Sequence, residues 1–260
     1  PCFLCQTNRP QEQEFISYRN YQILVNPYPI FKHHFTIADK EHKSQSIVGR
    51  FKDMIEFTDI MREYFLLYNG PECGASAPDH AHFQACSKEE SMQGSYYDHI
   101  ELIDNDKVRI SYEDFPYSFI RIQAKNKKTM SKTFHLIYDI LAANNNGKEP
   151  MMNILAWYGL EITKEHFRKN YDDEFESVAE HPYNCVIFLR SKHRPDCYYA
   201  KGDEQILISP AIAEMNGIFP IVREEDMEKL TPEKVYDIYR EVSISKEKLQ
   251  EIIERIKAAL

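Results

Sequence analysis

The stretch from His80 to Gln84 gathers side chains that could do chemistry. If it forms a strand, alternate residues point to opposite faces of a sheet. His80, His82 and Gln84 would then share one face, about 7 Å from end to end, while Ala81 and Phe83 would be buried on the other. Three such groups suit a metal ion or a phosphate. On spacing alone, a pair of ordinary surface or core histidines is an equally good interpretation.

A second group begins with Cys2 and Cys5. Two thiolates at this spacing can bind one Zn²⁺, but a tetrahedral site needs two further ligands, for which histidine is the usual complement. A redox dithiol is the alternative, although the βαβ context expected for it is absent. The spacing therefore favours zinc. The candidate histidine ligands are His33, His34, His42, His80 and His82.

One dense basic cluster, from Arg190 to Pro195, stands in an acidic chain. It follows a predicted strand, so its loop could bring charge to a phosphate. A solvated loop is the alternative. Lys32, His33 and His34 form a smaller cationic group with the same two interpretations.

The composition limits the class of protein. The 260 residues are 43 % apolar, which is enough for one large domain or two packed halves. With 41 acidic against 32 basic residues, the net charge of −9 disfavours a nucleic acid polymer as partner but allows a small phosphorylated metabolite.

The cysteines and the apolar runs indicate where in the cell the protein is expected. Six cysteines in a chain with no recognisable signal peptide favour metal binding or free thiols over disulfides. No apolar run is long enough to span a bilayer, so we expect no membrane partner and a cytoplasmic protein. The first residue is Pro1, so we expect that the natural N-terminus is missing.

The predicted elements alternate without the regular βαβ rhythm of a parallel sheet. Apolar residues at helical spacing from Ser46 to Asn69 predict one long helix with Ser46 as N-cap, and a second helix is predicted at 131–143. Thr231 and Ser245 are expected to begin two C-terminal helices. Strands are predicted at 14–25, 35–38, 108–112, 117–123, 152–158 and 184–190.

These elements predict an α+β fold, an antiparallel sheet with packed helices. The order of strands and helix recurs loosely after residue 125. We therefore expect two related halves: a catalytic half with the metal site at 1–125, and a second half at 126–260 that completes the substrate pocket.

Together the motifs resemble the galactose-1-phosphate uridylyltransferase branch of the histidine-triad superfamily. The resemblance rests on Cys2-Phe3-Leu4-Cys5, Ala38-Asp39-Lys40-Glu41-His42, Asn69-Gly70 and the stretch from Ser76 to Gln84. This chain departs from the pattern by one extra residue before His80 and by Ala81 in place of proline. The segments 80–85, 209–217 and 241–245 are also similar to GDP-L-galactose and GDP-D-glucose phosphorylases.

The resemblance implies a role for each matching residue. Cys2, Cys5, His42 and His80 would hold a structural zinc, and His82 would be the nucleophile. Gln84 and Ser76 would donate hydrogen bonds to phosphate oxygens. Substrate contacts are expected from Asn26, Pro27, Asn69 and Glu214, which lie in segments that resemble the family, and also from Arg190 and His193 of the basic cluster.

The implied activity is transfer of a nucleotidyl group from a nucleoside diphosphate sugar to phosphate or a sugar phosphate, through a covalent nucleotidyl-histidine. A dinucleoside polyphosphate phosphorylase or hydrolase is one alternative, and a zinc-stabilised nucleotide-binding protein without turnover is another. A zinc hydrolase with His42, His80 and His82 as ligands ranks behind these, because it leaves Cys2 and Cys5 unexplained. A homodimer is allowed.

Overall fold

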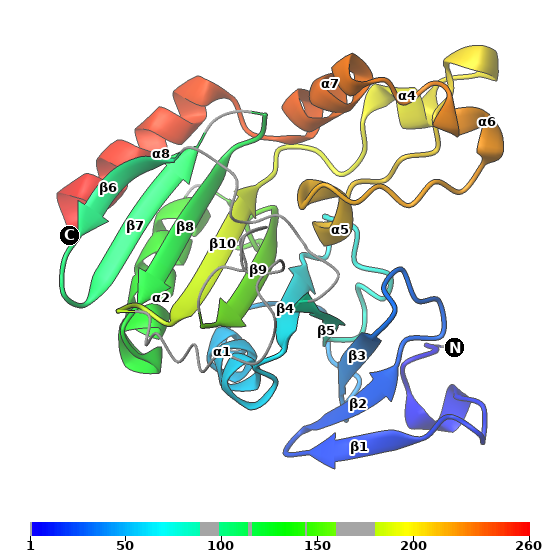
Figure 1. Cartoon of the computed structure of the whole chain (residues 1–260), viewed down its shortest axis with the longest axis horizontal. Coiled ribbons are helices and arrows are strands. Elements are labelled where there is room, and N and C mark those ends of the chain that lie inside the picture. The colour runs from blue at the N-terminus through cyan, green and yellow to red at the C-terminus, as the bar shows by residue number, and fades with distance from the viewer. Residues whose placement is uncertain (1, 89–98, 114–115, 144, 160–179) are drawn as a thin grey trace, which may run out of the picture.

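The computed structural model describes residues 2–88, 99–113, 116–143, 145–159 and 180–260 (Figure 1). The strands of the described residues form one antiparallel sheet, in which they lie in the order β1-β2-β3-β5-β4-β9-β10-β8-β7-β6. Its strands are β1 Phe15–Tyr18, β2 Tyr21–Val25, β3 His34–Asp39, β4 Tyr64–Asn69, β5 His82–Ser87, β6 Ile100–Asp104, β7 Val108–Glu113, β8 Phe119–Ala124, β9 Met152–Tyr158 and β10 Tyr183–Leu189. The predicted α+β class with an antiparallel sheet is confirmed.

Helices cover both faces of this sheet. On one face, α1 (Phe51–Ile60), α2 (Lys127–Ala142) and α8 (Lys246–Ala259) pack into the larger core. On the other, α5 (Ile212–Met215) and α7 (Pro232–Val242) cover a second, more aromatic core. The remaining short helices are α4 (Asp196–Tyr199) and α6 (Glu224–Met227), with 3₁₀ turns at Gln6–Asn8 and Gly202–Glu204. No described helix is long and apolar enough to cross a membrane.

The strand order repeats from the two edges of the sheet inward. From one edge it runs β1-β2-β3-β5-β4, and from the other β6-β7-β8-β10-β9, with α1 following β3 and α2 following β8. The two sets meet where β4 pairs with β9, so that Asn69 lies opposite Asn153. Because the second set begins with β6, we propose that the two units divide between Ser87 and Ile100 rather than at residue 125.

The long helix predicted from Ser46 to Asn69 is wrong. The helix spans Phe51–Ile60 only, and Tyr64–Asn69 is the central strand β4. A strand buried on both faces is apolar throughout, so its sequence also satisfies a helical period. Ser46 is not the N-cap, since its hydroxyl donates to the Glu149 carboxylate and Arg50 occupies the cap position.

Most other elements follow the sequence. β9 and β10 lie where two buried strands were predicted, and Thr231 and Ser245 accept the N-cap hydrogen bonds of α7 and α8. α2 begins at Lys127, before the predicted Ser131, because the Asn126 side chain caps it. Strand β6, whose residues are largely exposed, was not predicted.

The contact between α1 and α2 includes one stacked pair of aromatic rings. The rings of Phe51 and Phe134 lie parallel, with centroids 3.5 Å apart, and both side chains are buried. We expect Phe134→Ala to lower the free energy of unfolding by about 3–5 kcal/mol in urea denaturation, through lost burial and a cavity. The exposed Val222→Ala is the control, with about 0.5 kcal/mol or less. A loss below about 1 kcal/mol for Phe134→Ala would show that this stack does not hold the helices.

Candidate active site and metal cluster

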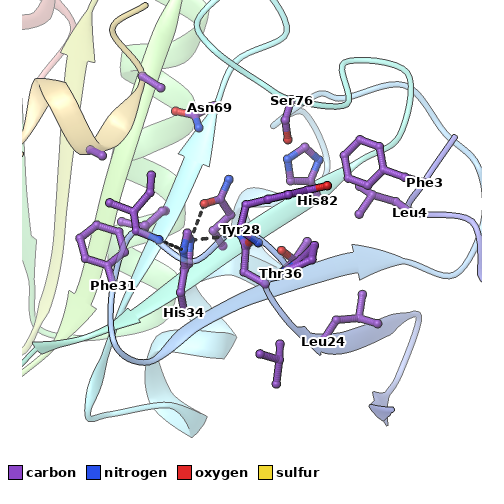
Figure 2. A pocket seen from close by; sticks show the side chains of 18 of the residues that line it. Phe3, Leu4, Leu24, Tyr28, Phe31, His34, Thr36, Asn69, Ser76 and His82 are labelled. Carbon is purple, nitrogen blue, oxygen red and sulfur yellow. Dashed lines mark hydrogen bonds between the residues drawn. The ribbon is translucent and has the colours of Figure 1, made fainter. Parts of the chain in front are cut away.

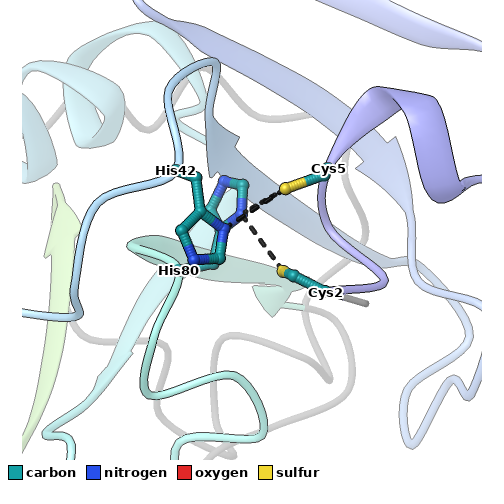
Figure 3. Close-up of side chains that lie close together, drawn as sticks. All are labelled: Cys2, Cys5, His42 and His80. Carbon is teal, nitrogen blue, oxygen red and sulfur yellow. Dashed lines mark hydrogen bonds between the residues drawn. The ribbon is translucent and has the colours of Figure 1, made fainter.

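The four predicted metal ligands come together from three parts of the chain (Figure 3). Cys2 and Cys5 precede the first 3₁₀ turn, His42 follows β3, and His80 precedes β5. The Cys2 Sγ lies 3.3 Å from His80 Nδ1, and the Cys5 Sγ lies 3.2 Å from His42 Nδ1 and 3.6 Å from His80 Nδ1. All four ligand atoms lie within 4.8 Å of one another.

These separations fit a tetrahedral zinc site. With Zn–S near 2.3 Å and Zn–N near 2.0–2.1 Å, neighbouring sulfur and nitrogen ligands lie about 3.6 Å apart. The second nitrogen of each histidine is also engaged, as is usual for ligating histidines: His80 Nε2 donates to the Asp39 carbonyl at 2.8 Å, and His42 Nε2 lies 3.5 Å from the Asp79 carboxylate. A four-ligand set leaves no open position for water, so a metal bound here is structural. That the metal is zinc stays a prediction.

Beside this cluster lies a cavity of about 650 Å³ (Figure 2). Its volume is in the range of small-molecule sites. Among the described residues that line it, only Arg9 and Glu214 are Arg, Lys, Asp or Glu, and the Arg9 guanidinium already donates to the Leu4 carbonyl and to Gln22. Most of the wall is apolar: Phe3, Leu4, Leu24, Val25, Ile30, Phe31, Leu67, Ile212 and Ala213.

His82 opens strand β5 and lines this cavity. Its Nδ1 donates to the His80 carbonyl at 2.8 Å, which leaves Nε2 as the nitrogen for chemistry. The Gln45 side chain holds its backbone on both sides: the His82 amide donates to Gln45 Oε1, and Gln45 Nε2 donates to the carbonyls of His82 and Asn69. Burial lowers the pKa of His82, which favours the neutral imidazole.

The expected donors all line this cavity. His82 and Gln84 alternate along β5 and both line the cavity, as do Ser76 and Asn69 (Figure 2). His80 precedes the strand, so the expected shared strand face holds for His82 and Gln84 but not for His80, whose ring turns to the metal cluster. The cavity thus combines one imidazole with amide and hydroxyl groups.

The other predicted contacts divide into two groups. Asn26, Pro27 and Glu214 line the cavity, and burial raises the pKa of Glu214. Arg190 and His193 are not among its described lining residues.

Arg190 is buried, and its guanidinium donates to the Asn153 side chain and to the carbonyls of residues 192, 193, 210 and 242. The rest of the basic cluster also contacts protein: Lys192 pairs with Asp196 and Glu241, and Arg194 donates to Ser209.

Sequence reasoning missed three residues that hold the site. Gln45 and Asn153 belong to no motif, and His34 was considered as a zinc ligand or part of a cationic group. In the structure His34 lines the cavity and contacts Gln84. A signal existed only for His34, which directly precedes the strand predicted at 35–38; in the structure it begins β3, next to β5, and alternates with Thr36.

Comparisons with known proteins come from sequence families and from solved structures. A protein family described as a domain of unknown function (DUF4922) matches residues 1–87, a segment that contains the four metal ligands, His82 and Gln84. No curated protein sequence matches the chain.

Among solved structures, the yeast Ap4A phosphorylase Apa2 is similar at 14 % identity and a TM-score of 0.57, over 86 % of this chain and 74 % of that one. The same enzyme in complex with AMP gives a TM-score of 0.52, and in complex with Ap4A 0.51, again at 14 % identity and over 86 % of this chain; the alignment covers 73 % and 74 % of those chains. At 14 % identity, the similarity shows only that the two proteins share a fold. It confirms the fold that the resemblance implied, while the closer resemblance to GDP-hexose phosphorylases stays a prediction.

The metal cluster can be tested by metal analysis. We expect about one zinc per chain in the purified protein, and Cys5→Ser should lose it because three ligands no longer close the tetrahedron. Chelation should lower the melting temperature, since the metal ties the segment before residue 6 to His42 and His80. Cys197→Ser, at a cysteine outside the cluster, is the matched control. Full zinc content in Cys5→Ser would contradict the assignment.

The loop that carries Ser76 packs closely against the segment before α5. Gly74 has a φ of +89°, and a Cβ there would lie 2.5 Å from the Ala211 Cβ. Gly49 has a similar φ of +75° but open space around it, so Gly49→Ala isolates the cost of the left-handed backbone, about 1–2 kcal/mol. We expect Gly74→Ala to cost more in thermal denaturation. Equal losses in the two variants would mean that the close approach to Ala211 is easily relaxed.

Proposed function

We propose that this protein is a nucleotidyltransferase that moves a nucleoside monophosphate from a nucleoside diphosphate sugar to phosphate or a sugar phosphate, through His82. The observation that carries the proposal is the state of this histidine: buried at the cavity wall, with Nδ1 fixed by the His80 carbonyl and Nε2 left for attack. A binding protein has no need of a nitrogen held in this way.

The proposed reaction has two displacements. In the first, His82 Nε2 attacks the α-phosphorus, a P–N bond forms, and the bond from that phosphorus to the bridging oxygen breaks, so that the sugar phosphate leaves. In the second, an acceptor phosphate oxygen attacks the same phosphorus and the P–N bond breaks. The new nucleoside diphosphate or nucleotide sugar leaves, and His82 returns to its neutral form.

The cavity suits such a substrate in two respects. Gln84, Asn69 and Ser76 lie near His82, where amide and hydroxyl groups can donate to non-bridging oxygens as charge shifts during transfer. The apolar wall around Phe31 and Leu24 offers a place for a base, and Asn26 beside it can bond to a base edge. Among the described residues, hydrogen-bond donors rather than lysines would stabilise the phosphates.

A second candidate is phosphorolysis of a dinucleoside polyphosphate, favoured by the fold shared with the yeast Ap4A phosphorylase. The same attack by His82 would then release a nucleoside polyphosphate in place of a sugar phosphate. The zinc hydrolase alternative fits poorly, because the metal ligands are two cysteines and two histidines in a closed set that excludes His82.

The test is turnover of several donors, followed by chromatography of the nucleotide products. GDP-hexoses, UDP-hexoses and Ap4A would each be offered with phosphate, hexose 1-phosphate or water. We expect one donor class to react only with a phosphate acceptor, and His82→Asn to lower the rate at least about 10³-fold, because the nucleophile is lost. His135→Asn, at an exposed histidine of α2, is the control that should keep full activity.

Mass spectrometry of the intact protein, without acid, adds a direct readout. With donor but no acceptor, the wild type should gain the mass of one nucleotidyl group and His82→Asn should not. Turnover that survives in His82→Asn would exclude the covalent route. No turnover of any donor, with nucleotide binding retained, would leave the zinc-stabilised binding protein as the better account.

A further inference from the structure

We propose that Arg190, Asn153 and His34 are positioning residues: they lock the amides of Asn69 and Gln84 so that both present only N–H donors to the nucleotide phosphate. The inference rests on the proposed function, since it assigns how that site recognises phosphate. Arg190 and Asn153 are not among the described residues that line the cavity, so any effect they have on phosphate binding passes through the residues that they contact.

The first lock is a chain of three side chains. Arg190 Nη1 donates to Asn153 Oδ1 at 2.6 Å, and Asn153 Nδ2 donates to Asn69 Oδ1 at 2.7 Å. A guanidinium can only donate, so the Asn153 atom facing it must be the oxygen, and the nitrogen must face Asn69. The backbone amide of Ile212 also donates to Asn69 Oδ1, at 2.8 Å. Two donors therefore converge on the Asn69 oxygen.

The consequence is a fixed direction at the cavity. With its oxygen held on the side of Asn153, Asn69 turns its nitrogen toward Ser76 and His82 (Figure 2). Arg190 is 3 % exposed, and its hydrogen bonds go to neutral oxygens, none of them a carboxylate. Its positive charge polarises both amides in the same sense, which strengthens Asn69 as a donor to an anion.

The second lock acts on Gln84 from the neighbouring strand β3. The backbone amide of Ile30 donates to His34 Nδ1 at 3.2 Å, so in the neutral ring the proton sits on Nε2, and the longer 3.4 Å approach of Asn26 Nδ2 to that nitrogen is then not a hydrogen bond. That nitrogen donates to Gln84 Oε1 at 2.7 Å (Figure 2), which leaves Gln84 Nε2 as the group to be offered to a ligand. His34 is buried and packs edge-on against Phe31, with ring centroids 5.1 Å apart, so its ring is held in place.

Both locks begin at a group that cannot reverse its role. Ile212 and Ile30 supply backbone N–H groups, and Arg190 supplies a guanidinium, none of which can accept a hydrogen bond. An amide free to flip would present its oxygen to the phosphate in part of the population, and that oxygen would repel it. Fixing the donors before the ligand arrives avoids this reorganisation.

The test separates binding of the phosphate from binding of the rest of the nucleotide. Calorimetry would give the Kd of the four ribonucleoside 5′-monophosphates and of the matching nucleosides. The key variant is Asn153→Asp, which keeps the shape and the contact with Arg190 but turns a second oxygen toward Asn69 and toward the Cys73 carbonyl, to which Asn153 Nδ2 also donates. Asn69 must then reverse or lose its contact. We expect monophosphate binding to weaken about 10- to 100-fold while nucleoside binding is unchanged.

His34→Phe tests the second lock independently, should Asn153→Asp fail to fold. It keeps a ring against Phe31 but removes the donor to Gln84, and it should reduce the preference for monophosphate over nucleoside in the same direction. The matched control is Asn184→Asp. Asn184 is also a buried asparagine that accepts from a buried arginine, Arg121, but it does not line the cavity, so the phosphate preference should be unchanged.

Each outcome separates the two proposals. If wild-type protein binds no monophosphate more tightly than its nucleoside, the proposed function fails and the locks fail with it. If wild type shows the preference and both variants keep it, the locks are wrong while the proposed function stands. Equal weakening of nucleoside and monophosphate would show a general disturbance of the fold, which also overturns the positioning role.

Discussion

The hydrogen bond from His82 Nδ1 to the His80 carbonyl is the interaction on which the site depends. The same residue that supplies this carbonyl turns its ring to the metal cluster, where its Nδ1 lies 3.3 Å from Cys2 Sγ. Because the ring of His80 is held at the cluster, its backbone carbonyl is held as well. This carbonyl accepts from His82 Nδ1 and so selects the tautomer of His82. A metal predicted at this cluster, with no open position of its own, would therefore still govern which nitrogen of His82 faces the cavity.

The metal cluster also shapes the cavity. Phe3 and Leu4 lie between the two cysteine ligands and form part of the cavity wall. Leu4 packs with Leu24 and Ala38 in a small core that is separate from the two larger cores. Apart from the predicted metal ligands, few of the described apolar side chains therefore hold the N-terminal segment in place. His82 and one wall of the cavity that it lines are thus both connected to this cluster.

The sequence predicted residues that belong to local patterns and missed those that act across long separations. The cysteine pair, the strands β9 and β10 and the caps of α7 and α8 follow from spacing or from neighbours a few residues away. Gln45 holds His82 from 37 residues away, and Asn153 holds Asn69 from 84 residues away. A periodic pattern in the sequence does not reveal pairs of residues so far apart. The error at 64–69 has another cause, since a fully buried strand and a buried helix have the same composition.

The pairing of β4 with β9 limits how the chain can be divided into parts that fold alone. The family match ends at residue 87, and every metal ligand and His82 lie within it. Yet β4 would be an outer strand in such a fragment, with the backbone groups that now pair with β9 open to other chains. We therefore expect a fragment that ends at residue 87 to pair along this exposed edge with another chain, either a second copy or an aggregate.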